Sequence, residues 1–355
     1  MMRSTCFTFV FAWTVACAAE TPSTCYAPAA HDYRSQVRTI GQLPSSSWYA
    51  FALPDGRAVA VTVAIETPEP SSHYAAFMID PADDTVEQVA AWDGSFGPMT
   101  LLDDGRLFLF ESGDCSYVLV ELEEGSATRK PCSGDGFNAE LVWQRSRSEL
   151  LLFGSAFREG IDSDGVVFSL DLGTSTLARL DVAVDDGFAR PPDAPFPLCD
   201  GRLVFPHTQH HDGDFLADAP AVHYYDPAQR ELTTVELPFA PDRAAQLDAG
   251  TALLIGRDND SEIAHVLDLD AGTSRPVGLP DEAVHPMYEE TLVGLADGTA
   301  LAVGMSGALH IYSPDSEQFT RLAVRFAGEP RRLLRLSTGA VLAFTGGDNA
   351  IELFE

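Results

Sequence analysis

The sequence predicts an all-β protein, a seven-bladed β-propeller built from four-stranded blades. Three observations lead to this prediction. A turn followed by a short apolar run recurs seven times, a second hairpin follows each copy but the last, and one strand near the N-terminus has no hairpin of its own. The copies lie between 41 residues (298 to 339) and 53 residues (148 to 201) apart, which is the spacing of propeller blades.

The recurring turn is of the Asp-Gly-Arg type and precedes four or five apolar residues. Gly accepts the positive φ that a tight turn needs, so Asp-Gly between two apolar runs is a strong hairpin signal. A short apolar strand precedes each turn, and each copy therefore supplies the first two strands of a blade. The seven copies occupy residues 53–63, 102–110, 145–154, 198–206, 247–256, 295–304 and 336–347.

The second hairpin supplies the third and fourth strands. Its turn often begins with Asp-Pro or Ser-Pro, which ends a strand and opens a turn. No apolar pattern of helical period interrupts the hairpins. They occupy residues 77–89, 115–132, 168–180, 223–235, 265–277 and 310–322.

The two ends of the chain predict how the ring closes. The seventh copy stops at 349–355, after its third strand, and an exposed sheet edge would remain there. The segment 33–43 has the pattern of a strand but no partner nearby. We expect it to pair outside 350–354 and to complete the last blade, so that residues 33–355 form one propeller domain.

The first residues predict export. Arg3 precedes an apolar run at 6–15 and then small residues, the pattern of a secretory signal. Two cleavage sites fit. In one, 14–17 acts as a lipobox, 1–16 is the signal peptide and Cys17 is the lipidated first residue; in the other, cleavage follows Ala18. The polar, Ala- and Pro-rich segment 17–32 suits a tether.

These alternatives predict either a bacterial outer-membrane lipoprotein facing the periplasm or the exterior, or a secreted protein. No later segment is apolar for long enough to span a bilayer, so we expect membrane attachment only through a lipid anchor.

The cysteine count agrees with an oxidising compartment. Besides Cys17, the mature chain has four cysteines, an even number that favours two disulfides. Cys115 and Cys132 flank a hairpin and are expected to pair. Cys25 and Cys199 then pair by elimination. The alternative is that these residues are free, buried thiols.

The charge of the chain restricts its partners. The formal net charge is -31, from 53 Asp and Glu against 22 Lys and Arg. Such a surface repels the phosphates of nucleic acids and anionic lipid headgroups, so neither is an expected partner. We expect a monomer.

Several details resemble the kelch group of propellers, which includes the central domain of galactose oxidase. Apolar strands end in Gly, as at 150–155 and 253–257; "YDP" and "YSP" precede the outer hairpins; and Pro and Arg precede inner strands, as at 329–335. The resemblance implies the propeller fold, and members of this fold have many functions. The copper chemistry of galactose oxidase needs a cysteine and tyrosine pair, which the predicted disulfides would not leave.

A cluster of histidines marks one candidate site. In a propeller, the loops between the second and third strands share a face with the loops between blades, and ligands usually bind there. The longest such loop, 206–221, contains the ligand-type residues His207, His210, His211, Asp212 and Asp214; His73 and His285 belong to the same face. Imidazole and carboxylate suit Zn²⁺, and the paired aspartates of other loops suit Ca²⁺. No established metal motif is present, and we expect no cofactor.

A group of arginines marks a second candidate site. Arg243, Arg331 and Arg332 precede inner strands, and Arg257 and Arg158 lie in neighbouring loops. Together they would form a positive funnel for an anionic ligand or an acidic peptide. The alternative is that they form salt bridges with the many aspartates.

The sequence therefore favours a binding or scaffolding protein of the bacterial envelope, without catalytic activity, that recognises a protein, peptide or glycan through its loops. It carries no nucleophile elbow and no Gly-rich phosphate loop. The alternative is a metal-dependent hydrolase or lyase with its site at 207–214.

Overall fold

A computed structural model describes residues 33, 36–65, 72–111, 115–134, 137–155, 165–182, 195–206, 208–212, 215–258, 261–280, 291–304 and 306–355. The predicted signal peptide, 1–16, and tether, 17–32, lie outside these residues, as do Cys17 and Cys25. Within them, no helix is long and apolar enough to cross a membrane.

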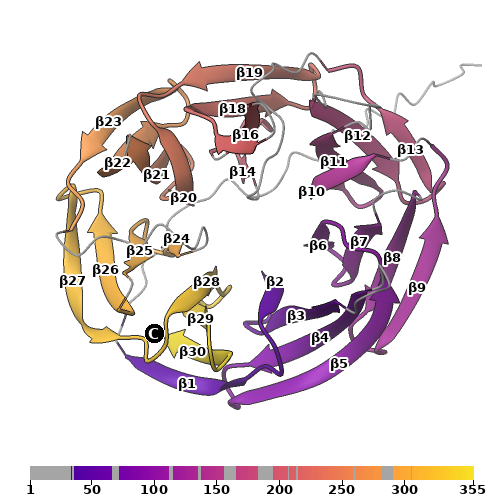
Figure 1. The fold of residues 1–355 in the computed structure, drawn as a ribbon, viewed down its shortest axis with the longest axis horizontal. Coiled ribbons are helices and arrows are strands. Elements are labelled where there is room, and N and C mark those ends of the chain that lie inside the picture. The colour runs from indigo at the N-terminus through magenta and orange to yellow at the C-terminus, as the bar shows by residue number, and fades with distance from the viewer. Residues whose placement is uncertain are drawn as a thin grey trace, which may run out of the picture.

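Seven antiparallel sheets of four strands stand around a central axis, which confirms the predicted all-β, seven-bladed propeller (Figure 1). Blades 1 to 3 comprise β2 (Ser47–Ala52), β3 (Ala58–Ile65), β4 (Ser72–Asp80) and β5 (Thr85–Gly94); β6 (Met99–Leu101), β7 (Leu107–Glu111), β8 (Ser116–Glu121) and β9 (Ser126–Pro131); and β10 (Asn138–Ser146), β11 (Glu149–Ser155), β12 (Gly165–Asp171) and β13 (Thr176–Arg179).

Blade 4 comprises β14 (Phe196–Pro197), β15 (Leu203–Phe205), β18 (Ala221–Asp226) and β19 (Glu231–Glu236). Blades 5 and 6 comprise β20 (Ala240–Gln246), β21 (Thr251–Asp258), β22 (Ser261–Asp268) and β23 (Thr273–Val277); and β24 (Leu292–Gly294), β25 (Ala300–Val303), β26 (Ala308–Ser313) and β27 (Gln318–Arg325). In each of these six blades the first strand is innermost and the last is outermost (Figure 1).

The N-terminal strand closes the ring, as predicted. Blade 7 contains β28 (Pro330–Arg335), β29 (Val341–Thr345), β30 (Ala350–Phe354) and, outside β30, β1 (Val37–Gln42). The register runs antiparallel from Val37 opposite Phe354 to Gln42 opposite Ala350. The Tyr33 ring stacks on Phe354, and its hydroxyl donates a hydrogen bond to the carbonyl of Gly339. The outer edge of the last blade is therefore covered.

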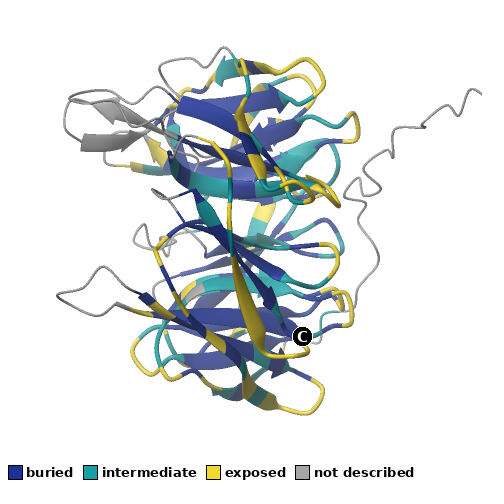
Figure 2. Ribbon diagram, turned by 90° about the vertical axis from the view of Figure 1, so that its right-hand side faces the viewer, coloured by how far each residue is buried: buried dark blue, intermediate teal, exposed yellow. Residues whose placement is uncertain are grey.

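Seven apolar clusters hold the ring together, one between each pair of neighbouring blades. β11 shows how one strand serves two of them. Leu150 and Leu152 pack toward blade 2, whereas Leu151 and Phe153 pack toward blade 4. Because successive side chains of a strand point to opposite faces, a blade buried on both faces needs an unbroken apolar run. Seen edge-on, the buried strands form a disc, and exposed residues gather in its turns and outer strands (Figure 2).

A local ion pair between Asp and Arg stabilises the Asp-Gly-Arg turns. In blade 1, Gly56 has a φ of 95°, and the Arg57 Nε lies 2.8 Å from Asp55 Oδ2. The same contact joins Arg106 to Asp104 and Arg202 to Asp200. The hydrogen bond from Arg106 lowers the pKa of the Asp104 carboxyl. The repeated motif is therefore explained by turn geometry.

The turns between third and fourth strands share a second rule. In six blades the last residue of this turn has a positive φ: Asp84, Gly125, Ser175, Arg230, Gly272 and Glu317. In four of them the Asp that ends the third strand accepts hydrogen bonds from turn amides, as Asp226 Oδ1 does from Ala228 and Gln229. This left-handed position is strained for residues other than Gly.

The glycines that end apolar strands have a structural reason. A bulge in the inner strand brings a carbonyl directly over the second strand, so that a Cβ on Gly154 would lie 2.0 Å from the Asn138 oxygen. Gly256 stands in the same relation to Ala240, with 2.1 Å. No side chain fits at either position.

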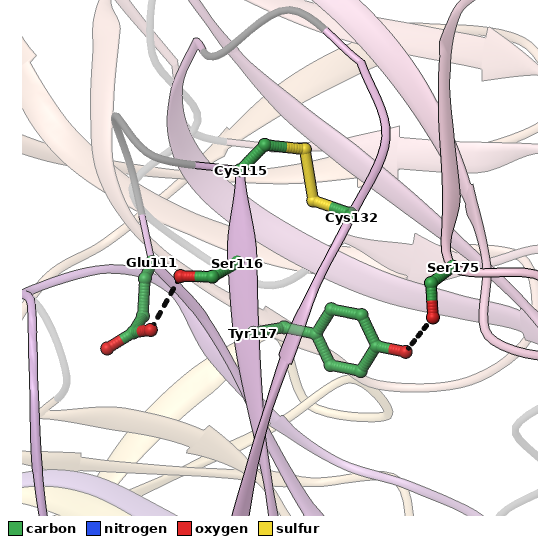
Figure 3. Close-up of a disulfide and its surroundings, with 6 residues drawn as sticks. All are labelled: Glu111, Cys115, Ser116, Tyr117, Cys132 and Ser175. Carbon is green, nitrogen blue, oxygen red and sulfur yellow. Dashed lines mark hydrogen bonds between the residues drawn. A yellow bond between two sulfur atoms is a disulfide. The ribbon is translucent and has the colours of Figure 1, made fainter.

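A disulfide joins Cys115 to Cys132, as predicted, with the two Cα atoms 5.2 Å apart (Figure 3). It links the start of the third strand of blade 2 to the end of the fourth. The Cys132 amide also donates to the Cys115 carbonyl. Cys199 is disulfide-bonded as well, whereas its expected partner, Cys25, lies outside the described residues.

Candidate binding surface on the loop face

The two faces of the disc differ in their connections. We call loop face the side with the loops between blades and between second and third strands, and turn face the side with the tight turns described above. The described parts of the loop face between blades are 43–46, 95–98, 132–134, 137, 180–182, 195, 237–239, 278–280, 291 and 326–329.

In the loop 95–98, between blades 1 and 2, most of the backbone polar groups form hydrogen bonds. The Ser95 amide donates to Glu111 Oε1, and the Ser95 carbonyl accepts from the Tyr74 hydroxyl. The Gly97 carbonyl accepts from the Tyr49 hydroxyl, at 2.8 Å, and the Pro98 carbonyl accepts from a backbone amide of β7. This loop nevertheless displays Phe96, which is 49% exposed. Among the residues that the structure describes, Phe96 is the large hydrophobic residue that is exposed.

A buried carboxylate anchors this loop. Glu111, at the end of β7, is 2% exposed. It also accepts hydrogen bonds from the Ser116 hydroxyl (Figure 3) and from the Arg129 guanidinium. Glu352 has the equivalent task between blades 6 and 7, because its carboxylate accepts from the amides of Ala327 and Gly328. The chain thus places buried acids where interblade loops need hydrogen-bond acceptors.

Polar side chains contact Asp93, shortly before Phe96 in the chain. His73, near the start of β4, contacts the Asp93 carboxylate near the end of β5. Arg129 donates to the Asp93 carbonyl. Both His73 and Arg129 are about half exposed, and Asp93, which both contact, precedes Phe96 by three positions.

The structure describes only part of the predicted histidine site. Residues predicted as one loop form an additional hairpin, in which β16 (Gln209–Asp212) pairs with β17 (Phe215–Asp218). His210 and His211 are adjacent in β16, and successive strand positions belong to opposite faces. His207, Asp214 and His285 lie outside the described residues. Among those that are described, no group of three or more His, Cys, Asp or Glu could hold a metal ion. The metal site stays a prediction.

The predicted arginine funnel is distributed over several environments. Arg243 lies within the inner strand β20, and Arg331 and Arg332 lie within β28, rather than before these strands. Arg243 is 1% exposed and pairs with Asp242, at 2.9 Å, and Glu262, at 3.1 Å. Arg257 lies 3.8 Å from Asp242, and its side chain is half exposed.

On blade 7, Arg331 is exposed and Arg332 is half-buried. Arg158 lies outside the described residues. Arg243 therefore belongs to a buried ion-pair network, and the exposed members of the proposed funnel are Arg257 and Arg331.

Sequence reasoning missed three buried histidines. His223, His265 and His310 each lie three residues before the end of a third strand, in blades 4, 5 and 6. The signal was the repeated "HYYD", "HVLD" and "HIYS". His223 Nδ1 is 2.9 Å from the Thr208 hydroxyl, and the His265 ring lies beside Phe239. Burial lowers the pKa of His265.

The fold is that of the β-propellers, and solved structures similar to this chain agree. A streptogramin B lyase has a TM-score of 0.60 at 11% identity, over 90% of this chain and 97% of that one. An oligogalacturonate lyase in complex with manganese has 0.58 at 13% identity, over 93% and 95%. The WD40 β-propeller domain of Doa1 has 0.55 at 11%, over 90% and 97%. No family model and no curated protein sequence matches. At these identities the likeness shows the fold alone.

Proposed function

We propose that this protein is a non-enzymatic binding or scaffolding protein that captures a protein or peptide partner through its loop face. The observation that carries the proposal is the loop 95–98, which is fixed by hydrogen bonds and yet displays Phe96. A rigid aromatic side chain gives up little conformational entropy on binding and buries a large area. Aromatic anchors inside a polar rim are typical of binding hot spots.

The experiment is a selection of peptides from a displayed library on the immobilised protein, followed by affinity measurements on the Phe96→Ala variant. We expect a loss of about 2 kcal/mol or more in binding free energy. Phe96→Trp should retain binding, because it keeps a large ring. Thr338→Ala, on the turn face, is the matched truncation and should change nothing. Equal binding by the wild type and Phe96→Ala would show that Phe96 does not anchor the partner. Selective capture of glycans from an array would favour the glycan alternative.

A negatively charged partner segment is supported by the cations of the loop face. Arg331 and Arg257 are exposed on a chain whose formal net charge is -31. Charges at the rim of an interface act mainly on the rate of association. Reversing Arg331 and Arg332 to Glu should lower the association rate of acidic peptides at low salt. The same reversal at Arg230, on the turn face, serves as the control. An unchanged rate would end the funnel hypothesis.

We further propose that the protein is exported and anchored through Cys17. The support is the pattern of the first residues and the disulfide between Cys115 and Cys132, a bond that persists in oxidising compartments. Mass spectrometry of the mature N-terminus tests this. Diacylglycerol on Cys17 indicates a lipoprotein, whereas a free amine at residue 19 indicates secretion.

The alternative is a metal-dependent hydrolase or lyase at 207–214. A neighbour in fold is described as a manganese complex of a lyase, and histidines cluster in this segment. Elemental analysis of protein purified without a chelator or a His-tag decides. Stoichiometric metal that is lost in the His207→Ala/His210→Ala variant would favour the enzyme.

A further inference from the structure

One buried carboxylate connects the disulfide of blade 2 to the loop 95–98. The Glu111 side chain is 2% exposed. Its oxygens accept hydrogen bonds from the Ser95 amide at 3.0 Å, the Ser116 hydroxyl at 2.7 Å and the Arg129 guanidinium at 2.6 Å. Ser95 begins the loop, whereas Ser116 and Arg129 belong to β8 and β9. The same carboxylate therefore holds the loop and two donors of the disulfide-linked hairpin.

The two cysteines lie close to these donors along the chain. Cys115 directly precedes Ser116 at the start of β8, and Cys132 follows Arg129 by three positions, just after β9. The Cys132 amide also donates a hydrogen bond of 2.8 Å to the Cys115 carbonyl. The Ser116 hydroxyl points to the Glu111 carboxylate beside the disulfide (Figure 3). The disulfide thus joins the strand ends that carry both donors.

The backbone of Cys115 has a conformation that its surroundings must maintain. Its φ is 44°, in the left-handed region, which is unfavourable for a residue with a Cβ. Such conformations persist when neighbouring contacts enforce them. Cleavage of the disulfide removes the covalent restraint, so that Cys115 can return to a negative φ. Because this angle sets the direction in which the chain enters β8, the Ser116 hydroxyl then moves away from Glu111.

The loop between blades 6 and 7 provides an internal comparison. There, Glu352 accepts a hydrogen bond of 3.0 Å from the Ala327 amide, as Glu111 does from the Ser95 amide. The chain has no cysteine after residue 199, so no disulfide joins strands beside this second acid. The Ala327 amide therefore reports on general stability, whereas the Ser95 amide also reports on the disulfide.

We propose that the disulfide between Cys115 and Cys132 holds the loop 95–98 in place through Glu111, so that reduction by a dithiol releases this loop and weakens partner capture. The weakening of capture rests on the function proposed above, whereas the release of the loop does not.

The chemical step is a thiol–disulfide exchange. A thiolate of the dithiol attacks the sulfur of Cys132, which is more exposed than Cys115, and Cys115 leaves as a thiolate. The second thiol of the reductant then attacks the mixed disulfide and releases Cys132. The two cysteines gain two electrons and two protons, and the dithiol becomes a cyclic disulfide.

Hydrogen exchange of the Ser95 amide, followed by NMR, tests the release of the loop. The main variant is Cys115→Ser/Cys132→Ser, because a dithiol would also reduce the disulfide of Cys199. We expect exchange at Ser95 to be at least about 10-fold faster in this variant, since its amide loses a charged acceptor. Exchange at Ala327 should change by no more than about twofold. Treatment of the wild type with dithiothreitol should reproduce the change at Ser95.

Two single variants test the route through Glu111. Ser116→Ala removes a donor to this acid, so exchange at Ser95 should be faster with the disulfide intact, and loss of the disulfide should then add less. Tyr117→Phe removes the neighbouring hydroxyl, which lies 2.8 Å from the Ser175 hydroxyl instead (Figure 3). It should leave exchange at Ser95 as in the wild type. Thermal unfolding verifies that each variant is folded at the temperature of the measurement.

The effect on capture is measured with peptides that have been selected on the oxidised protein. They should bind the Cys115→Ser/Cys132→Ser variant at least about 10-fold more weakly. Peptide binding that does not depend on Phe96 would contradict the loop-face proposal alone, because exchange at Ser95 needs no peptide. Three results would overturn the present inference: unchanged exchange at Ser95, an equal rise at Ser95 and Ala327, or unchanged affinity of peptides that do depend on Phe96.

Discussion

Replacing Ile40 with Ala should test whether the N-terminal strand is a necessary part of the fold. Ile40 lies in β1 and is 6% exposed, and it packs in the cluster between blades 7 and 1 with Leu353 and Phe77. The change removes three carbon atoms, about 2.4 kcal/mol of transfer free energy at ~0.8 kcal/mol each, and leaves a cavity. We expect a loss of about 3 kcal/mol in the free energy of unfolding.

The assay is equilibrium unfolding in urea, followed by tryptophan fluorescence. Thr39→Ala is the matched control, because Thr39 is the neighbouring residue in β1 and its side chain is exposed. It should change stability by no more than about 0.5 kcal/mol. The Ile40 variant should keep one transition with the same slope and a lower midpoint. If both variants behave alike, or if a small early transition carries the whole loss, β1 frays independently and the closure reasoning fails.

Three further predictions concern turns, the disulfide and pH. Arg230→Gly should raise the free energy of unfolding by about 0.5–1 kcal/mol in chemical denaturation, because Arg230 has a φ of 57°; Gly125→Ala should lower it, since a Cβ there would lie 2.5 Å from a backbone oxygen. Equal changes in the free energy of unfolding for the two variants would contradict this reasoning. Replacing Cys115 and Cys132 with Ser should cost about 3 kcal/mol in thermal unfolding, from the loop of 17 residues that the disulfide closes; no change on reduction would refute it. Burial lowers the pKa of His265 below its ordinary value. The His265 ring is therefore protonated more readily in the unfolded chain than in the folded one. The contribution of the neutral ring to stability is complete above about pH 6.5 and is lost as the pH falls toward the pKa of the folded state. His265→Phe should flatten stability curves over that interval, and an unchanged slope would exclude this residue.

The fold was predictable because its rules are local and repeated. The apolar run at 150–153 needs no alternation when both faces of a blade are buried, and the turn at 55–57 is a contact between residues two apart. Closure followed from counting strands, since only 33–43 lacked a partner.

The candidate sites were less predictable because they depend on contacts between distant residues. Nothing near Phe96 in the sequence shows that its loop is anchored by Glu111, from the next blade. Arg243 was interpreted as a channel cation, whereas it is buried and pairs with its neighbour Asp242 and the more distant Glu262.

The last blade has a consequence for biosynthesis. Its sheet combines residues 37–42 with residues 330–354, and Tyr33 donates its hydrogen bond to a residue 306 positions further on. A strand made early in synthesis must therefore wait for residues 350–354 before it finds its partner, and such long-range pairing slows folding. During this interval β1 has no partner strand and the sixth blade lacks the seventh blade that packs against it, and an unpaired strand promotes association between chains. Synthesis of residues 350–354 is thus the event that permits this sheet to form.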